Sequence, residues 1–455
     1  MNKYKISNYS FSYRYGANSN YVNLLFSGRT AKLIQVNDST YDALVNGKLG
    51  ELTQTAFNTL FENKYIIPFD EDELYAINSE NAALFEKQHT DVLYLSIQPT
   101  SFCQFNCVYC GQEHTPHNLR SDVIDTILAR IEYKLSNTKA DKLEIGWFGG
   151  EPLCAMPQMR TLNSKIKRLC KKYDKEYISH LTTNGYLLNL NTYNELVNEF
   201  NVRGIEITLD GDKYYHDKRR FLSNGKGTFE IIYSNILSII KSSCFHEKTC
   251  RLSIRCNIDL QNIDGVLPLI YQLSKDSLQD IIIFYFTEVV SWAKNGAGLN
   301  EADKQLMSGK VIEILYNLLT LGFSCPILPT RIPPKHCMAS SSESEMYDTF
   351  GNVFDCSEIS YSEIYQGSEL HLGKLSNNNI PNVFERSVLN TYKDRLLDGI
   401  YKPCNKCKFY PVCGGGCPKG LHEGEPRCPS FIYNIKERML LEYLRINQLI
   451  GKVNQ

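Results

Sequence analysis

The sequence has no long apolar segment. No run approaches the roughly 20 apolar residues that a helix needs to cross a bilayer. The first residues, MNKYKISNYSFSYRYG, contain no apolar core of the length found in signal peptides. The formal net charge is −1, which gives no support for nucleic acid or an acidic membrane surface as a partner. We therefore expect a cytoplasmic protein that binds neither nucleic acid nor membrane.

Internal repeats and low-complexity tracts are also absent, and the first 90 residues contain no cysteine. The whole chain nevertheless has 16 cysteines in 455 residues, a length that allows two or three domains with cores. In a short secreted chain this number would indicate disulfides. In a long chain without a secretion signal, clustered thiols are more typical of metal ligands, and disulfides remain an alternative.

Residues 1–90 predict a small α/β module of winged-helix type. YVNLLFSG (21–28) alternates as a strand does, and NDSTYDALVNG (37–47) begins with capping residues that favour a helix. Residues 51–69 indicate a helix that runs into a strand. This module is either an extension that packs on the rest of the chain or a docking module for a partner.

Residues 91–324 alternate between strands and helices. The predicted strands are 92–97, 142–148, 177–183, 204–209, 251–259 and 280–286. The predicted helices are 121–135, 155–172, 190–200, 228–242, 264–274 and 302–322. Such alternation predicts a parallel sheet with right-handed crossovers. Six units are too few for a closed eight-stranded barrel, so we expect a partial (β/α)6 barrel with its chemistry at the carboxyl ends of the strands.

Residues 325–455 lose this alternation and are rich in cysteine. They predict a metal-organised C-terminal domain with little regular structure, which ends in a helix over residues 430–449.

A loop with three cysteines, SFCQFNCVYCGQ, follows the first barrel strand. Cys103, Cys107 and Cys110 are separated by three and then two residues. Three thiolates suit iron–sulfur chemistry. A zinc site completed by His114 or His117 is the alternative.

The spacing CxxxCxxC, with Tyr109 before the last cysteine, resembles that of the radical S-adenosylmethionine enzymes. The resemblance implies a [4Fe-4S] cluster on Cys103, Cys107 and Cys110 whose open iron chelates S-adenosylmethionine. Reductive cleavage of this cosubstrate would give a 5′-deoxyadenosyl radical, which takes a hydrogen atom from the substrate.

Motifs at later strand ends resemble the same family. They are FGGEP (148–152), TTNG (182–185), TLDGDKYYHDKRR (208–220), in which Asp210, His216 and Arg219 match, and the arginine of SIRCNID. FGGEP alone could also be a plain strand-to-helix turn. By resemblance, the cosubstrate-binding residues are Tyr109, Gly149, Gly150, Glu151, Thr183, Asn184, Asp210 and Arg255.

Seven C-terminal cysteines resemble the SPASM domain, an extension of radical S-adenosylmethionine enzymes that act on peptides and proteins. The resemblance implies an outer auxiliary [4Fe-4S] cluster on Cys404, Cys407, Cys413 and Cys428, and an inner cluster on Cys337, Cys356 and Cys417. Residues 338–355 lack an eighth cysteine that some relatives carry. The inner cluster then has an open iron, or borrows Cys325, a nearby non-cysteine ligand or the substrate. Zinc is the alternative for this domain.

Three functions fit these motifs. The first is a maturase that abstracts hydrogen from a ribosomally made precursor peptide and forms a C–C, C–S or C–O cross-link or another side-chain modification. The second is an anaerobic sulfatase-maturating enzyme, and the third is a non-catalytic iron–sulfur electron carrier. About 100 residues precede the cysteine loop, whereas sulfatase-maturating enzymes usually begin close to theirs. We therefore favour the peptide maturase, with an N-terminal module that captures the peptide by strand addition.

The remaining predictions concern the partners and the acid–base residues. We expect an electron donor such as flavodoxin or ferredoxin. Glu288 and Tyr285 are acid–base candidates only because of their positions in the chain. The sequence therefore does not identify the catalytic residues. Cys154, just past Glu151, is the motif-free cysteine that lies nearest the expected site.

Overall fold

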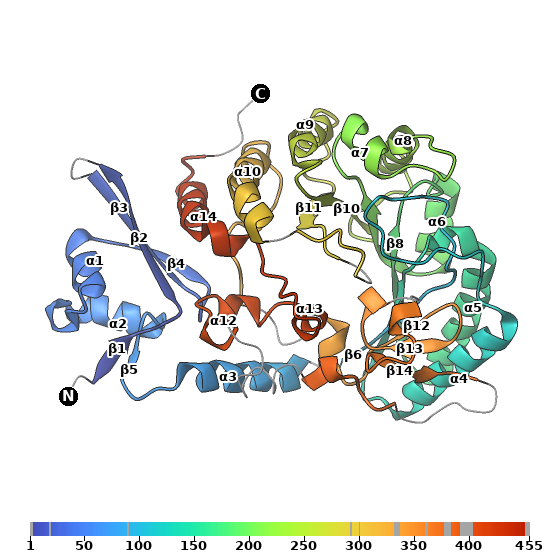
Figure 1. Cartoon of the computed structure of the whole chain (residues 1–455), viewed down its shortest axis with the longest axis horizontal. Helices are drawn as coiled ribbons and strands as arrows, with labels where there is room; N and C mark the ends of the chain where they lie inside the picture. The colour runs from blue at the N-terminus through green and yellow to red at the C-terminus, as the bar shows by residue number, and fades with distance from the viewer. Residues whose placement is uncertain are drawn as a thin grey trace.

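The computed structural model describes residues 3–17, 20–88, 91–291, 294–299, 301–331, 337–359, 363–376, 384–391 and 404–450. The N-terminal strands lie at one end, the large parallel sheet with its helices lies at the other, and α12 (Tyr410–Cys413) and α13 (Pro418–His422) lie between them (Figure 1). Among the described helices, none is long and apolar enough to cross a membrane.

Six parallel strands form the predicted barrel sheet. They are β6 (Val92–Ile97), β7 (Lys142–Trp147), β8 (Glu176–Thr183), β9 (Val202–Thr208), β10 (Arg251–Ile258) and β11 (Ile283–Glu288). Each pairs with its predecessor in the chain, so the sheet runs from β6 to β11 in sequence order. The prediction of an open, partial barrel is confirmed.

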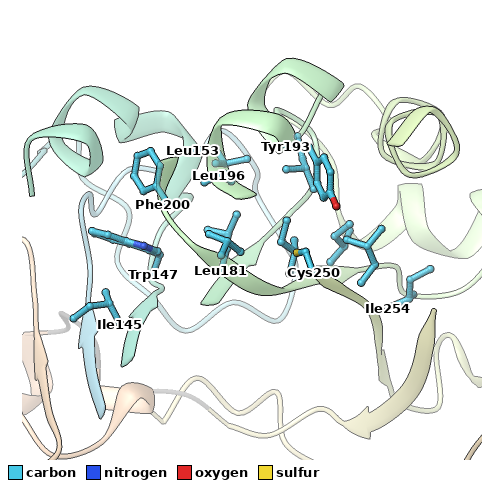
Figure 2. Packing of buried hydrophobic residues seen from close by; sticks show 14 of the residues in the cluster. Ile145, Trp147, Leu153, Leu181, Tyr193, Leu196, Phe200, Cys250 and Ile254 are labelled. Carbon is cyan, nitrogen blue, oxygen red and sulfur yellow. The ribbon is translucent and has the colours of Figure 1, made fainter. Parts of the chain in front are cut away.

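Helices cover the convex side of this sheet. They are α4 (Ser121–Asn137), α5 (Met156–Lys172), α6 (Leu190–Glu199), α8 (Phe229–Ile240), α9 (Val266–Lys275) and α10 (Glu301–Thr320). The short helix α7 (Lys213–Arg219) between β9 and α8 was not predicted. Trp147 of β7 packs edge-on against Phe200 after α6, with ring centroids 6.2 Å apart (Figure 2).

The sheet extends beyond the six predicted strands. β12 (Glu345–Tyr347) from the cysteine-rich region pairs in parallel with β6, and β13 (Asn352–Phe354) and β14 (His371–Lys374) continue antiparallel. A buried ion pair between Arg130 of α4 and Glu345, 2.6 Å long, holds β12 against the barrel. Strands of three or four residues carry too little alternation to be predicted from sequence.

The N-terminal module is a three-stranded antiparallel sheet with helices. β2 (Ser10–Ala17), β3 (Asn20–Ser27) and β4 (Lys32–Val36) pair in that order, and α1 (Asp38–Val45) and α2 (Gln54–Glu62) follow. β1 (Tyr4–Ile6) pairs with β5 (Ile66–Pro68), and α3 (Glu73–Gln88) leads from this module toward the barrel (Figure 1). The predicted strand near residues 21–28 and both predicted helices are present.

This module shares its core with the cysteine-rich region. Phe11 and Phe26 lie in one buried cluster with Val412, Ile435 and Met439, the last two from α14 (Phe431–Ile446). Ion pairs reinforce the contact.

The ion pairs centre on Arg29, which is 4% exposed and binds Glu71 and Glu80. Arg331, just before the first cysteine of the C-terminal set, also binds Glu80, at 3.1 Å. The module therefore packs on the body of the protein, which was one of the two alternatives for it.

Candidate active site

The three cysteines of the loop lie between β6 and α4, next to one another. Burial raises the pKa of all three thiols. In Cys103 the carboxylate of Glu151 and the neighbouring thiols of Cys107 and Cys110 raise it further. The charge of Arg220 opposes the shift in Cys107 and Cys110. Three thiols close together can serve as ligands of one metal site.

The cysteine loop is fixed by the segment that follows α7. The Asn106 N–H donates to the Phe221 carbonyl at 2.8 Å, and the Val108 N–H donates to the Arg219 carbonyl at 3.0 Å. The loop between β6 and α4 is thereby tied to the end of the βα unit of β9, and the thiols are held over the carboxyl ends of the strands.

A cavity of about 120 Å³ lies beside the thiols. It is lined by Cys103, Phe105, Cys107, Cys110, Gln112, His114, Phe148, Gly149, Gly150, Thr182, Thr183, Asn184, Thr208 and Arg220. Four of the predicted cosubstrate residues, Gly149, Gly150, Thr183 and Asn184, therefore face the cavity directly. The other four do not line it.

Gly149 and Gly150 have backbone conformations that favour glycine, with φ of +91° and +56°. A Cβ on Gly149 would lie 2.6 Å from the side chain of Gln98, and one on Gly150 would lie 2.6 Å from the Phe102 carbonyl oxygen. The Gly150 N–H donates to Gln112 at 2.8 Å. The turn therefore presents backbone to the cavity at a place where no side chain fits.

Glu151 supports the cavity from behind. Its carboxylate accepts hydrogen bonds from the Thr183 hydroxyl at 2.7 Å, the Asn184 N–H at 2.7 Å and the Leu153 N–H at 3.0 Å. Burial raises its pKa, and these hydrogen bonds oppose that shift. Glu151 thus connects the end of β7 to the end of β8 and orients two residues of the cavity.

Tyr109 belongs to a polar network that lies under the cysteine loop. Its hydroxyl donates to Asp210 at 2.5 Å and accepts from Arg220 at 2.6 Å and from the Asn257 amide at 3.0 Å. The other oxygen of Asp210 accepts the Asn257 N–H at 2.8 Å. Arg219 binds Asp259 at 2.7 Å. The phenol and the carboxylate position the loop, and Arg220 links this network to the cavity.

Sequence reasoning singled out Arg219 but missed Arg220, Asn257 and Gln112. Arg220 stood in the quoted segment DKRR, beside the arginine that matched the family signature. The residue that lines the cavity is its neighbour, because Arg219 is turned toward Asp259. Two adjacent arginines offer no sequence signal that separates these roles.

Arg255 and His216 also lie outside the cavity lining. The Arg255 guanidinium donates to Asn257 at 2.9 Å and lies 3.6 Å from Glu206. His216 is buried, and its Nδ1 accepts the Asp210 N–H at 3.2 Å. Burial, with Arg220 and Arg219 nearby, keeps the pKa of His216 well below its usual value.

Cys404, Cys407, Cys413 and Cys428 form one group of thiols in the C-terminal region. Burial raises the pKa of Cys404 to about 11 and that of Cys413 to about 12, and each is raised further by the neighbouring thiols of the group. Gly414, Gly415 and Gly416 all have positive φ, which lets the chain turn tightly after Cys413.

Cys337, Cys356 and Cys417 form a second group, in a cavity of about 380 Å³. Burial raises the pKa of Cys337 to about 11, and Cys417 adds to the shift. The non-cysteine residues of the cavity are Tyr94, Met338, Ala339, Ser357, Glu358, Pro418 and Lys419. In the described residues no three Cys, His, Asp or Glu side chains converge around a single ion.

Of the three other candidates, Cys154 lies beside the cysteine loop, as the sequence suggested. Cys325 does not line the inner cavity and lies near Arg438 and Arg445 of α14, so it is not placed as the missing inner ligand. Cys154 donates to Gln104 at 3.2 Å. Glu288 is ion-paired with Lys304 at 3.3 Å, and burial raises its pKa.

Comparisons with known proteins agree with this geometry. Residues 97–246 match the family model described as Radical SAM superfamily. A cysteine-type anaerobic sulfatase-maturating enzyme of Clostridium novyi (strain NT) is 24% identical over 372 residues, which cover 74% of this chain and 90% of that protein.

Solved structures give the same picture. Native anSMEcpe with bound AdoMet and Cp18Cys peptide is 17% identical, covers 79% of this chain and 99% of its own, and has a TM-score of 0.56. Streptococcus suis SuiB bound to precursor peptide SuiA is 16% identical and covers 93% of this chain and 98% of its own, with a TM-score of 0.45, too low to support an argument. The part of the chain that holds the cysteine loop and strands β7, β8 and β9 thus matches the Radical SAM superfamily, whose members are enzymes.

Proposed function

We propose that this enzyme modifies a ribosomally made precursor peptide, from which it abstracts hydrogen to form a cross-link or another side-chain modification. The observation that carries the proposal is the arrangement of three groups of thiols along one chain. One group lies at the barrel mouth, and two lie in a C-terminal region that extends the barrel sheet through β12. A relative of similar architecture has been solved with a bound peptide.

In this proposal Cys103, Cys107 and Cys110 hold a [4Fe-4S] cluster. When bound, the cluster and S-adenosylmethionine would supply the one-electron chemistry by which a hydrogen atom is taken from the substrate. The backbone of Gly149 and Gly150 binds the amino end of the cosubstrate. Thr183 and Asn184, oriented by Glu151, line the other side, while the network of Tyr109 and Asp210 holds the loop in place.

The two C-terminal groups are proposed to hold auxiliary iron–sulfur clusters. Cys404, Cys407, Cys413 and Cys428 supply four ligands to the outer cluster. Cys337, Cys356 and Cys417 would supply three to the inner one, in the cavity that Tyr94 also lines. An external donor such as flavodoxin or ferredoxin supplies the electron.

The chain is proposed to divide into a peptide-recognition module (1–90), the barrel (91–324) and the auxiliary-cluster domain (325–455). In the described residues, β2 and β4 each pair with β3 alone, so each has an edge open to a further strand. An extended peptide can add to such an edge through main-chain hydrogen bonds.

A second candidate is the maturation of a sulfatase by conversion of a cysteine or serine side chain to formylglycine. The observation in its favour is the similarity to the Clostridium novyi enzyme over most of that protein's length. It requires no N-terminal peptide-recognition module.

One experiment separates the two candidates. Reduced, anaerobically reconstituted enzyme is incubated with S-adenosylmethionine and the short peptides encoded beside its gene, and peptide masses are measured. A loss of two hydrogens from one peptide, with 5′-deoxyadenosine formed, is the expected result. Unchanged peptides together with conversion of a sulfatase-motif peptide would establish the second candidate instead.

The cluster assignment has its own test. Replacing Cys103, Cys107 and Cys110 with Ala should remove about four irons per chain and abolish 5′-deoxyadenosine formation. The signals of the auxiliary clusters should remain in electron paramagnetic resonance spectra. The control is Cys170→Ala, a buried cysteine of α5 outside all three groups, which should keep the full iron content. An unchanged iron content in the triple variant would contradict the assignment.

A further inference from the structure

The concave face of the barrel sheet carries a layer of polar side chains halfway along the strands. We call it the middle layer, and its residues are Tyr94, Glu144, His180, Glu206, Arg255 and Tyr285, one from each strand from β6 to β11. Tyr94 is directly opposite Glu144, and Arg255 is directly opposite Tyr285, in the register of the sheet.

Contacts inside the middle layer divide it into two groups. His180 Nε2 lies 3.4 Å from Glu144 Oε1. On the other side, Glu206 lies 3.6 Å from Arg255 and accepts a hydrogen bond from the Tyr285 hydroxyl. Glu206 is thus shared by a guanidinium and a phenol, whereas the ion-pair partner of Glu144 in the described residues is an imidazole.

Two glycines make room for this layer. A Cβ on Gly146 would lie 2.4 Å from the Tyr94 hydroxyl, and a Cβ on Gly204 would lie 2.7 Å from His180 Nδ1. The side chains of Tyr94 and His180 therefore lie across neighbouring strands instead of standing away from the sheet. Tyr94 and His180 thus cover the two glycines on this face of the sheet.

The middle layer is open to solvent, unlike the packed interior of a closed barrel. The side chains of Glu144 and Glu206 are each 26% exposed, that of Arg255 is 35% exposed and that of His180 is 42% exposed. The strand residues between them, such as Leu143 and Ile145, are fully buried against the helices. A charged layer that is partly exposed on the face of a sheet can serve as a surface for a ligand.

The charges of the layer define what it can bind. It contains two carboxylates and one guanidinium, and Glu206 is already matched by Arg255. Glu144 has an imidazole as its partner, which is not a permanent cation. Tyr94, which is directly opposite Glu144 in the sheet, is a phenol and supplies no positive charge. The layer is therefore short of one positive charge beside Glu144.

We infer that the concave face takes a lysine or arginine side chain of the peptide substrate, and that Glu144, held by His180, binds its cationic end. The inference rests on the proposed function, because it names a feature of the same peptide substrate. Glu144 is then a residue that determines specificity, and the substrate class is a peptide with a basic residue at or next to the site of modification.

The position of the layer suits this role. Thr182 and Thr208, which line the cosubstrate cavity, each lie two residues further along their strands than His180 and Glu206. That separation corresponds to about 7 Å along a strand. Tyr94 also lines the cavity of Cys337, Cys356 and Cys417. A side chain anchored at Glu144 would lie below the cosubstrate and beside the inner group of thiols.

The test measures the binding of two small probes to the reconstituted holoenzyme with S-adenosylmethionine present. The probes are N-acetyl-lysine-N′-methylamide and its uncharged analogue N-acetyl-norleucine-N′-methylamide, and ligand-observed NMR detects their millimolar binding. Wild-type enzyme should bind the lysine probe about tenfold more tightly than the norleucine probe, the size expected for a charge-assisted hydrogen bond. The variant Glu144→Gln should lose this preference.

Two further variants exclude an indirect effect. Glu176→Gln makes the same change in an exposed carboxylate at the start of β8, which pairs with Lys142, and it should keep the preference. Glu144→Lys should instead prefer N-acetyl-glutamate-N′-methylamide, an outcome that a merely destabilised fold cannot give.

Equal binding of the lysine and norleucine probes by wild-type enzyme, no binding of the lysine probe, or a preference unchanged in Glu144→Gln would each overturn the inference. These outcomes are independent of the peptide-mass assay. A failure of the proposed function, in which no peptide is modified, is therefore distinguishable from a failure of the inference.

Discussion

Single residues determine the shape of the cosubstrate cavity. Gly149 and Gly150 bring bare backbone to its wall, and Glu151 uses three hydrogen bonds to fix the residues opposite. The motif FGGEP indicates which residues matter. Packing, and not the motif, places the two glycines at the cavity wall and the carboxylate of Glu151 behind it.

Gly150→Ala should destabilise the enzyme and weaken cosubstrate binding. The left-handed backbone costs about 1–2 kcal/mol for a residue with a Cβ. The added atom also meets the Phe102 and Thr100 carbonyl oxygens at 2.6 and 2.7 Å. Thermal unfolding and calorimetric titration with S-adenosylmethionine measure the two effects.

The matched control is Gly225→Ala. Gly225 has φ of +82°, but a Cβ there meets nothing within 4 Å. It should show the backbone cost with unchanged cosubstrate affinity. If both variants bind S-adenosylmethionine as the wild type does, the close approach at Gly150 does not shape the cosubstrate site.

His216 should make stability depend on pH. His216 is buried and its pKa is held well below the usual value. Its imidazole therefore stays neutral in the folded enzyme, whereas in the unfolded chain it takes up a proton near pH 6.5. The unfolded state then binds more protons, and stability falls as pH drops below about 6.5. Unfolding of wild type and His216→Gln between pH 5.5 and 8 checks this. The stability of the variant should depend less on pH than that of the wild type. Parallel curves of stability against pH would contradict the assignment to His216.

At the scale of elements, hydrophobic periodicity was sufficient to predict the long helices and strands. The predicted strands and helices of the barrel are present, because each strand buries one face and each helix a stripe against it. β12, β13 and β14 were missed because the pairing of β12 with β6, which the other two strands extend, is decided by contacts such as that of Arg130 with Glu345, over 200 residues apart in the chain. α3 was missed as well, since its first half shows no clear apolar stripe.

The open edges of the N-terminal sheet predict where a precursor peptide binds. Strand addition would give hydrogen-bond partners to the outward amides of β2 or β4 and slow their hydrogen exchange about tenfold or more. β3, which is paired on both sides, should not change and is the internal control. Hydrogen exchange measured by mass spectrometry with and without the peptide tests this. If the peptide changes the exchange rate of neither β2 nor β4, strand addition is ruled out.

At the scale of the whole molecule, the N-terminal module cannot be treated as a removable part. Tyr9, Phe11 and Phe26 bury their faces against residues of α12 and α14, and Arg29 ties the module to α3. Removal of residues 1–88, the direct test of peptide capture that the sequence suggests, would also uncover the region around the outer group of thiols.

Deletion of residues 1–88 should therefore lower the iron content and cause association. Five apolar side chains of the C-terminal region that pack against the module would be exposed, Tyr410, Val412, Leu421, Ile435 and Met439. Each costs about 1.5–3 kcal/mol when uncovered, and the sum is comparable with the whole stability of a domain. Iron analysis and sedimentation check this. A monomeric truncated chain with full iron content would show that the contact is dispensable.

The sequence by itself determined the chemistry and the order of the barrel. The patterns that carried these predictions are local: the spacing of cysteines, the glycine pairs, and the alternation of strands and helices. Each lies within a short stretch of chain and can be read there. The tertiary structure decided everything that depends on distant contacts.

These contacts brought Cys417 to Cys337 and Cys356, turned Arg220 rather than Arg219 toward the cavity, and joined β12 to β6. They also aligned Glu144 with His180 on the concave face of the sheet. The reason is that side-chain direction and strand neighbours are set by packing across the whole molecule, which no short stretch of sequence contains.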